Sequence, residues 1–338
     1  MARAAWATHE ARSTLTRPLL REKLSRFNGS LMSLTFTGER FLTDCQGEIV
    51  YEHWHRYFLA CEQARGKRVL DVASGEGYGS HLLASVADTV VGVDISADAV
   101  AHASVKYGKE NLQYIAASCT EIPLPDASFD YIVSFETIEH IDEAAQTAFL
   151  REVNRLLKPG GVFLISSPNR PEYSEKKGYQ NEFHVKELDK EEIRLQLSTY
   201  WPELIWAGQR LGFYSVIWNI DSSPQLAKAY PAAGAALFPE PMYFMVYCAK
   251  SAAALAEVQS SITLISDSSN EVYEAWARTY SQNVQLHERN QQLEREIAAL
   301  ARQMGSEPAS PESSASTPLT SVIAPEPWLV RLAKRLAG

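Results

Sequence analysis

Short β-rich runs alternate with helical stretches over the middle of this chain, and this alternation limits the possible folds more than any other feature. Strands joined through helices require a mostly parallel sheet with helices on both faces and right-handed connections. Seven candidate strands can be recognised, of which the last two are at 213–218 and 243–249. The first five runs are KRVLDVA, TVVGVDI, LQYIAA, FDYIVSF and GVFLISS at 67–73, 89–95, 112–117, 129–135 and 161–167. Helices are expected between them at about 78–87, 97–107 and 143–157, the last followed by a KPGG turn.

Composition divides the 338 residues into five parts. Residues 1–37 form a variable leader, and 38–250 hold the α/β domain. A helical region follows at 251–304, because it contains no proline or glycine. Residues 305–327 are rich in Ser, Pro and acid and are expected to be a disordered linker. The last eleven residues, 328–338, form a basic amphipathic helix that contacts a membrane surface or a partner such as a glycosyltransferase, or else a frayed tail.

The region before the linker has the spacing of a coiled coil. Apolar positions recur at intervals of four and three from Val272 to Met304. With Leu286 and Leu293 at position d, Asn290 lies at position a, where Asn sets the register of a parallel two-stranded coiled coil. The sequence therefore predicts a homodimer through residues 272–304, with a single helix packed on its own domain as the alternative.

Charge and cysteine usage exclude several classes of protein. The net charge of −9 makes an electrostatic grip on nucleic acid improbable. The four cysteines, which are Cys45, Cys61, Cys119 and Cys248, form no metal-ligand grouping with the eight histidines, so no metal is expected. Charges interrupt the N-terminal segment, and no apolar run reaches the roughly 18 residues of a membrane span. We expect a cytoplasmic protein, peripheral to the inner face of a membrane if its C-terminus binds there.

The loop after the first strand, LDVASGEGYG at 70–79, predicts a ligand site. Open α/β sheets bind ligands at the carboxyl ends of their strands, and glycines allow the backbone to approach a ligand closely. The spacing G-x-G-x-G differs from the dinucleotide pattern G-x-G-x-x-G, and Glu76 within the loop would repel a phosphate. Asp94 ends the second strand, where its two oxygens could accept both hydroxyls of a ribose. Acids on both sides of the loop suit a ligand that carries an ammonium and a sulfonium group.

Four segments taken together resemble the ordered motifs of class I S-adenosylmethionine (SAM)-dependent methyltransferases. They are VLDVASGEGYG, VVGVDIS, LPDASFDYIVSFETIEHI and LLKPGGVFLISSPN. The resemblance covers about 38–190 and implies a Rossmann-like seven-stranded sheet whose last strand is antiparallel, with SAM across the strand ends. It implies that Asp71 orients the amino group of SAM and Asp94 holds the ribose. The full set of cofactor-binding residues expected from it is Asp71, Ser74, Gly75, Gly77, Asp94, Ile95, Ser118, Cys119, Glu136 and Arg56.

One position departs from the family pattern. Members usually place an aspartate after the third strand to bind the adenine amino group, whereas this chain has Ser118 followed by Cys119. We expect the adenine pocket to be kept, with a weaker contact there. Upstream, the EHWHRYFLA segment is expected to form a lid in which Arg56 reaches the SAM carboxylate.

Methyl transfer needs the acceptor held in line with the methyl group, and a hydroxyl acceptor also benefits from a base. The best-placed candidates are Glu136, Glu139 and His140 in SFETIEHI. The resemblance implies that Glu136 faces the cofactor and His140 the acceptor, and a structural role within the turn is the alternative for His140. His184 in FHVKEL is a further candidate, either at the acceptor or in loop packing. Three segments are similar to segments of methyltransferases of bacterial surface-polysaccharide and O-antigen assembly. They are TGERFLTD, EHWHRYFLA and FHVKEL. That similarity implies a sugar or glycan acceptor, at a hydroxyl or a phosphate. The rivals are a methyltransferase for a quinone precursor or polyketide, a noncatalytic scaffold and, last, an NAD-dependent enzyme.

Overall fold

A computed structural model describes residues 41–43, 45, 47–212, 238–258, 262–266 and 270–303. The chain divides into two units, residues 1–269 and 270–338. The predicted leader at 1–37, the linker at 305–327, the basic helix at 328–338 and the predicted strand at 213–218 lie outside the described residues. None of the helices in the described part combines the length and the apolarity that crossing a bilayer requires.

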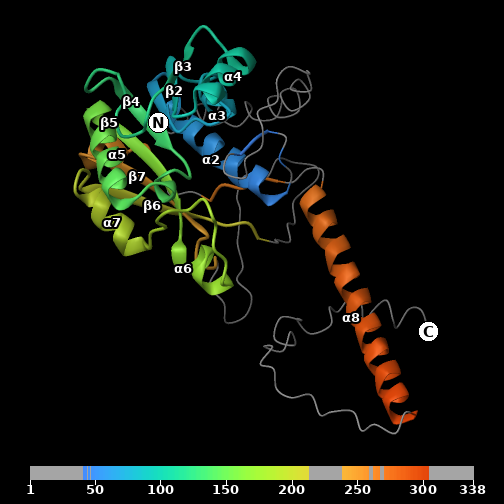
Figure 1. The fold of residues 1–338 in the computed structure, drawn as a ribbon. Helices are drawn as coiled ribbons and strands as arrows, with labels where there is room; N and C mark the ends of the chain where they lie inside the picture. Colours follow the sequence, from blue (N-terminus) through green and yellow to red (C-terminus); the bar gives the residue numbers. More distant parts are fainter. Residues whose placement is uncertain are drawn as a thin grey trace, which may run out of the picture. The chain divides into compact units, whose positions relative to one another are not determined.

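The first unit holds a seven-stranded sheet of order β3-β2-β1-β4-β5-β7-β6 (Figure 1). Strand β7 is antiparallel to both of its neighbours, and the pairs among the first five strands are parallel. This confirms the predicted Rossmann-like sheet with its antiparallel last strand. The strands are β1 (Arg68–Val72), β2 (Thr89–Asp94), β3 (Leu112–Ala116), β4 (Phe129–Ser134), β5 (Leu157–Pro168), β6 (Glu203–Gln209) and β7 (Tyr243–Ala249).

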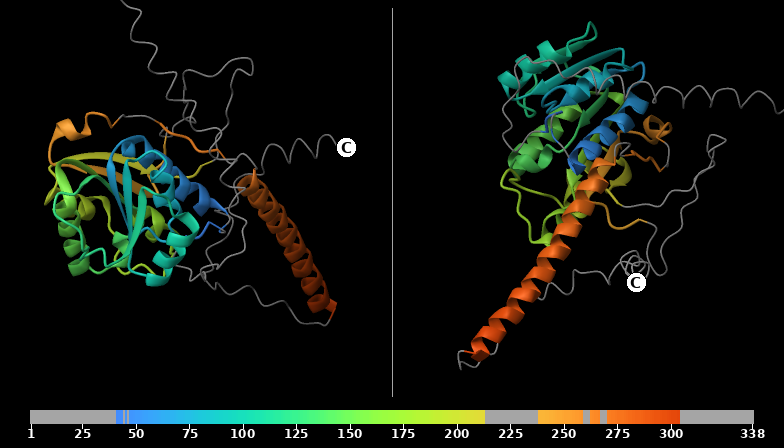
Figure 2. Two further views of the ribbon diagram at one scale, coloured as in Figure 1. Left: turned by 90° about the horizontal axis from the view of Figure 1, so that it is seen from above. Right: turned by 90° about the vertical axis from the view of Figure 1, so that its right-hand side faces the viewer.

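Helices cover both faces of this sheet, as the two views of Figure 2 show. Helices α2 (Glu48–Ala64), α3 (Tyr78–Leu83) and α4 (Ala97–Tyr107) contribute to one core cluster, and α5 (Glu143–Leu156) and α7 (Lys190–Ser198) contribute to the other. The described part of the unit also contains a short helix α6 (Arg170–Tyr173) and the 3₁₀ turns η1 (Ile138–His140), η2 (Glu175–Lys177) and η3 (Ala252–Leu255). The layered arrangement follows from strands whose successive side chains enter opposite cores.

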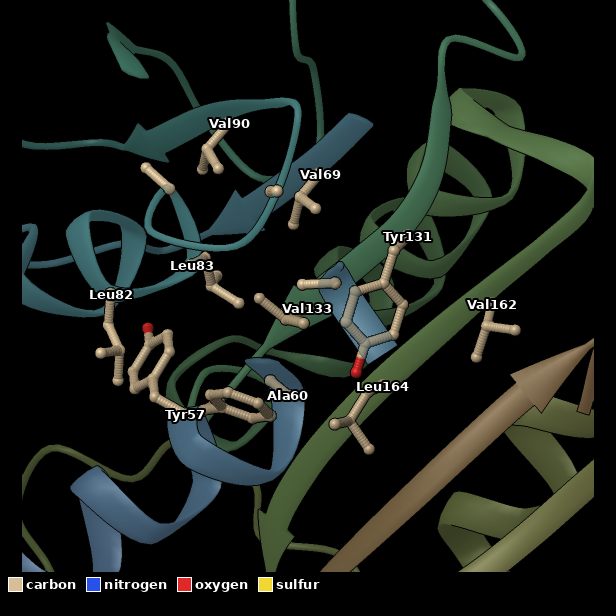
Figure 3. Packing of buried hydrophobic residues seen from close by; sticks show 14 of the residues in the cluster. Tyr57, Ala60, Val69, Leu82, Leu83, Val90, Tyr131, Val133, Val162 and Leu164 are labelled. Atoms are coloured by element: carbon tan, nitrogen blue, oxygen red, sulfur yellow. The ribbon is translucent and has the colours of Figure 1, made fainter. Parts of the chain in front are cut away.

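Alternate residues of single strands show this division directly. Val69 of β1 lies in the cluster beneath α2 and α3, whereas its neighbour Leu70 lies in the cluster beneath α5. Figure 3 shows the first cluster, in which Tyr57 and Ala60 of α2 lie near Leu83 of α3 and the strand residues Val133 and Leu164. Tyr57 thus belongs both to the core and, as described below, to the wall of the cavity.

Two sequence predictions about local structure were wrong. The KPGG segment is part of β5, which starts at Leu157 directly after α5, and the pairing with β4 shifts register between Phe129 and Tyr131. An irregularity in the pairing therefore replaces the expected turn. Strand β6 at Glu203–Gln209 was missed, because its residues are only partly buried or exposed and include Glu203, Gly208 and Gln209, so the segment is not a strongly apolar run.

The second unit contains one long helix, α8 (Glu271–Gln303). The helix is shorter than the predicted 251–304, because residues 252–255 form η3 and the helix begins only at Glu271. Its proposed seam positions are exposed, with exposed fractions of 61% for Leu286, 38% for Leu293, 65% for Ile297 and 57% for Leu300.

Candidate functional site

A cavity of about 530 Å³ lies where β1, β2, β3 and β4 end. Its wall includes 73–76 after β1, 93–95 at the end of β2, 117–120 after β3 and 135–137 after β4. Helix α2 and the loop that contains His184 close other sides. The size is in the range of small-molecule sites. The strand order changes direction beside β1, which joins β2 and β4, so the cavity lies where open α/β sheets bind ligands.

Strained backbone marks two sides of this cavity. Ala73 and Glu136, which follow β1 and β4, have φ values of 61° and 50°, in the left-handed region that non-glycine residues rarely adopt. Gly75 continues the turn with a φ of 57°, which glycine adopts without a steric penalty because it has no Cβ. Both strained residues line the cavity. Strain of this kind concentrates at ligand sites, where the surrounding structure holds it in place.

Asp94 joins the glycine loop to β2. Its Oδ2 accepts the backbone N–H of Gly75 at 2.8 Å, and its Oδ1 accepts that of Ser96 at 2.9 Å. The carboxylate also lines the cavity. These two contacts orient the carboxylate of Asp94 between the glycine loop and the start of α4. The ribose role expected for Asp94 stays a prediction.

Asp71 does not line the cavity in the way that the resemblance implies. The side chain is fully buried, and it accepts hydrogen bonds from Ser80 Oγ at 2.6 Å and from the hydroxyl of Tyr57 at 3.2 Å. Burial raises the pKa of this carboxyl to about 7, against hydrogen bonds that lower it. Asp71 therefore positions Tyr57, which does line the cavity.

Gly77 also supports the site from behind. An added Cβ would lie 2.6 Å from the Cβ of Ala103 and 2.8 Å from the hydroxyl oxygen of Tyr114. That hydroxyl donates to the carbonyl of Gly77 at 2.7 Å. The glycine is required for close packing of the loop against α4 and β3, and it does not form part of the cavity wall.

Glu76, which the sequence analysis expected to repel a phosphate, is buried and paired with a cation. Only 3% of the residue is exposed, and its carboxylate accepts hydrogen bonds from Lys106 Nζ and, at 2.6 Å, from the backbone N–H of Thr43. Although burial acts to raise the pKa of Glu76, these partners hold it below its usual value. Because Lys106 compensates the charge, Glu76 gives little discrimination against a phosphate.

Helix α2 places a cationic group at the cavity. Arg56 is 2% exposed, its Nε donates to Gln209 Oε1 at 2.7 Å, and its guanidinium lies 4.4 Å from the ring centre of Tyr243. One terminal nitrogen lies 3.6 Å from Glu136 Oε1. Neither terminal nitrogen has a hydrogen-bond partner within the described ranges. A buried guanidinium whose terminal nitrogens lack hydrogen-bond partners is suited to bind a ligand carboxylate.

Two polar residues of the wall were missed by the sequence analysis. Glu52 lies one helical turn before Arg56 and accepts a hydrogen bond from the hydroxyl of Tyr243 at 3.0 Å. Burial raises the pKa of Glu52 to about 7. The spacing of Glu52 and Arg56 on one helix face was a usable signal, whereas the distant Tyr243 was not.

The expected adenine end contains Ile95, Ser118 and Cys119. Ile95 is 77% exposed although it lines the cavity, so its side chain offers an apolar surface to a ligand ring. Ser118 Oγ accepts the backbone N–H of Thr120 at 3.2 Å and lies 2.8 Å from the hydroxyl of Thr120. Burial raises the pKa of the Cys119 thiol to about 11, so this residue is a neutral thiol at physiological pH.

At the opposite end, Glu136 and both predicted bases line the cavity together. Glu136 Oε1 accepts a hydrogen bond from Ser166 Oγ at 2.5 Å. The rings of His140 and His184 are perpendicular, with centres 5.0 Å apart. Glu139 lines the cavity beside these two histidines and is fully buried. Burial raises the pKa of its carboxyl well above the usual range. Ten of the twelve predicted site residues thus form one cavity, with Ser74 among them and with Asp71 and Gly77 behind it.

Comparison with known families identifies a domain in this part of the chain. A family model described as a methyltransferase domain matches residues 70–165. A probable S-adenosylmethionine-dependent methyltransferase of Mycolicibacterium smegmatis is 38% identical over 170 residues, which are 49% of this chain and 65% of the relative. One from Mycobacterium tuberculosis is 37% identical over 163 residues, 47% of this chain and 58% of the relative. The matches therefore span about three fifths of these relatives.

Solved structures show weaker similarity. The YcgJ protein of Bacillus subtilis is 26% identical, with a TM-score of 0.40, over 47% of this chain and 71% of its own. The PH0226 protein of Pyrococcus horikoshii is 23% identical, with a TM-score of 0.42, over 59% of this chain and 89% of its own. The methyltransferase-domain model matches residues 70–165, the segment that contains the glycine loop, Asp94 and Glu136.

Proposed function

We propose that this chain is a SAM-dependent methyltransferase that transfers a methyl group to a hydroxyl, or to a phosphate, of a sugar or glycan. The arrangement of Asp94 carries the proposal for the cofactor, because its carboxylate fixes the glycine loop and faces the cavity at once. SAM would lie across the strand ends, with its ribose at Asp94, its adenine at Ile95 and its carboxylate at Arg56.

The proposed reaction is an in-line displacement. The acceptor oxygen attacks the methyl carbon, the bond from that carbon to sulfur breaks, and S-adenosylhomocysteine leaves as a neutral thioether. A hydroxyl acceptor also gives up its proton, for which His140 and His184 are the available groups. Most of the acceleration comes from holding the two reactants close and collinear.

The acceptor end is polar, and this supports a hydroxyl-bearing substrate. Tyr173, Asn181 and His184 line the cavity there, together with Glu136 and His140. Hydroxyls of a sugar can exchange hydrogen bonds with these groups. The resemblance of TGERFLTD, EHWHRYFLA and FHVKEL to methyltransferases of surface-polysaccharide assembly adds a biological context.

The principal rival acceptor is a small molecule of another pathway. Similar proteins include a fatty-acid O-methyltransferase, a phosphoethanolamine N-methyltransferase and a ubiquinone/menaquinone C-methyltransferase. A scaffold that keeps the fold without catalysis is the second rival. Transfer of labelled methyl from SAM to a cell-envelope glycan fraction, with identification of the product, supports the glycan. Transfer to a lipid or quinone fraction alone contradicts it.

The cofactor assignment has a direct test in a substitution at Asp94. Asp94→Ala should abolish measurable SAM binding in calorimetry, because the ribose acceptor and the support of Gly75 are lost together. Asp98→Ala is the matched control, since it removes the same charge from an exposed position of α4. Normal SAM affinity in Asp94→Ala would exclude the proposed ribose contact. Absence of binding in the unaltered chain would favour the scaffold.

His140→Ala tests the base separately. It should lower turnover strongly while SAM affinity stays near that of the unaltered protein. Unchanged turnover would remove His140 from catalysis and leave His184 as the candidate.

We also propose that α8 forms a homodimer as a parallel two-stranded coiled coil. The exposure of Leu286, Ile297 and Leu300 supports this, because an apolar seam is costly to leave in water. We place the protein in the cytoplasm, with its C-terminus available for a membrane surface or a glycosyltransferase.

A further inference from the structure

Glu139 presents an unusual buried carboxyl group. The residue is fully buried, and neither side-chain oxygen has a hydrogen-bond partner in the described part of the chain. A buried polar group without partners destabilises the fold, and more so if it is charged. The carboxyl is part of the cavity wall, so a ligand that enters the cavity can satisfy it. The nearest titratable groups indicate which kind of ligand this is.

His140 and His184 lie beside Glu139, and the Nδ1 of each ring has a partner in the protein. The Nδ1 of His140 lies 3.0 Å from the carbonyl oxygen of Phe183, which can only accept, so Nδ1 carries a proton. The Nδ1 of His184 lies 2.6 Å from Glu187 Oε1. An imidazole that has its single proton on Nδ1 presents its lone pair on Nε2.

This pattern is the one that metal-binding histidines show. A ligating imidazole usually donates its second N–H to a carbonyl or a carboxylate, which fixes the tautomer and the ring orientation. Here Phe183 supplies the carbonyl for one ring and Glu187 the carboxylate for the other. Asn181 donates to Nε2 of His184 at 3.0 Å, and the same amide lies 3.4 Å from the hydroxyl of Tyr173. It can therefore keep a partner if that nitrogen turns to an ion.

The distances fit a shared ion. Glu139, His140 and His184 place one ligand atom each within 4.8 Å of one another, and Nε2 of His140 lies 4.0 Å from Glu139 Oε1. Two ligands of one ion at about 2.1 Å each are at most about 4.2 Å apart. Side-chain rotations that move these ligand atoms by a few tenths of an ångström would bring all three within bonding distance of one ion.

We propose that Glu139, His140 and His184 bind a divalent transition-metal ion at the acceptor end of the cavity. Two imidazoles and one carboxylate suit Mn²⁺, Fe²⁺, Co²⁺ or Zn²⁺ better than Mg²⁺ or Ca²⁺, which prefer oxygen ligands. A cation would compensate the buried carboxylate of Glu139. Three protein ligands leave coordination positions for water or an acceptor oxygen.

The role of the ion rests on the proposed methyl transfer. An acceptor hydroxyl that coordinates the ion loses its proton more readily, as water does on a bound metal. The proton passes to solvent, the oxygen then attacks the methyl carbon of SAM, and the carbon–sulfur bond breaks. On this account His140 and His184 act as ligands, and neither serves as the base.

Metal binding can be measured without SAM or an acceptor. The full-length chain is stripped with a chelator and titrated with Mn²⁺ and Zn²⁺ by calorimetry, and with Co²⁺ by visible absorption. We expect one ion per chain and a Co²⁺ spectrum that reports nitrogen ligands. Glu139→Gln, His140→Ala and His184→Ala should each weaken binding by at least about tenfold, and Glu187→Gln should weaken it by a similar factor through His184. His287→Ala on α8 is the control.

The outcomes separate the two proposals. Glu139→Gln keeps the shape of a protonated acid, so circular dichroism and SAM affinity should remain normal while metal affinity falls. No metal binding by the unaltered chain, or binding that Glu139→Gln leaves unchanged, would overturn the site and leave Glu139 as a protonated buried acid. Metal binding without methyl transfer to any acceptor would keep the site and reject the proposed function. SAM binding and activity in chelator-treated protein would keep the function and reject the role of the ion.

Discussion

Gly79→Ala tests whether the back of the glycine loop positions the cavity wall. The Cβ of an alanine at this position of α3 would overlap three carbon atoms of the Tyr57 ring. The ring is confined, because its hydroxyl donates to both oxygens of Asp71, at 3.2 and 3.3 Å. It also packs edge-on against Tyr78 and Phe135, with ring centres 5.3 and 5.0 Å away. The substitution therefore displaces either the ring or the helix.

The magnitude follows from two opposing effects. Overpacking in a core costs about 1–3 kcal/mol, and the fixed ring places this case at the upper end. Replacing Gly by Ala inside a helix returns about 1 kcal/mol. The net loss is about 2 kcal/mol in the free energy of unfolding, or about 4–8 °C in Tm for a domain of this size. SAM affinity should also fall, because Tyr57 lines the cavity.

Thermal unfolding and calorimetric titration with SAM check both effects. Gly160→Ala is the matched control, since an added Cβ there meets nothing within 4 Å. We expect the control to change Tm by no more than about 2 °C, because surface substitutions are usually within ±0.5 kcal/mol. Equal Tm and equal SAM affinity in the two variants would refute the reasoning, since the loop would then not depend on the packing of Tyr57.

Three further predictions concern other parts of the chain. Because burial raises the pKa of Asp71 to about 7, the folded protein keeps a proton that the unfolded chain releases near pH 4. Stability should fall by roughly 3 kcal/mol from pH 5 to pH 8, and Asp71→Asn should flatten this part of the curve in denaturant unfolding. Tyr114→Phe removes the donor to the carbonyl of Gly77, so it should cost about 1 kcal/mol and weaken SAM binding a few-fold in calorimetry. Leu293→Glu should weaken dimerisation at least about tenfold in sedimentation, because it places a charge in the proposed seam, whereas Gln292→Glu outside the seam should not. An unaltered pH profile, unchanged loop stability or an unchanged dimer would contradict the respective premise.

The sequence predicted the first five strands because each is a short buried run between helices. It failed for β6, whose residues are only partly buried or exposed and include Glu203, Gly208 and Gln209, so the sequence shows no strongly apolar run there. It also failed for the segment after α5, where proline and two glycines are absorbed into β5 as an irregular pairing. Local residue preferences indicate a turn there, and only the neighbouring strand β4 overrides them.

Site residues near the glycine loop were easier to predict than their contacts. Asp94 and Gly75 line the cavity, as their sequence positions indicated, but the same reasoning treated Glu76 as an uncompensated charge that would repel a phosphate. Its partners Lys106 and Thr43 lie 30 and 33 positions away. A charge can be recognised in a sequence, whereas its compensation depends on which distant side chain the fold brings to it.

The sequence analysis predicted no metal site for the same reason, because the contacts between distant residues depend on the fold. Glu139 and His140 are adjacent in the chain, and His184 follows 44 positions later, a spacing that matches no common ligand motif. The fold supplies the connection, because the backbone N–H groups of Val185 and Lys186 donate to the carbonyl of Glu139 at 2.8 and 3.0 Å. These two bonds hold the His184 loop against the end of η1. Whatever the cavity binds at this end must therefore contact both segments at once, and a shared ion would connect them through side chains as these bonds do through the backbone.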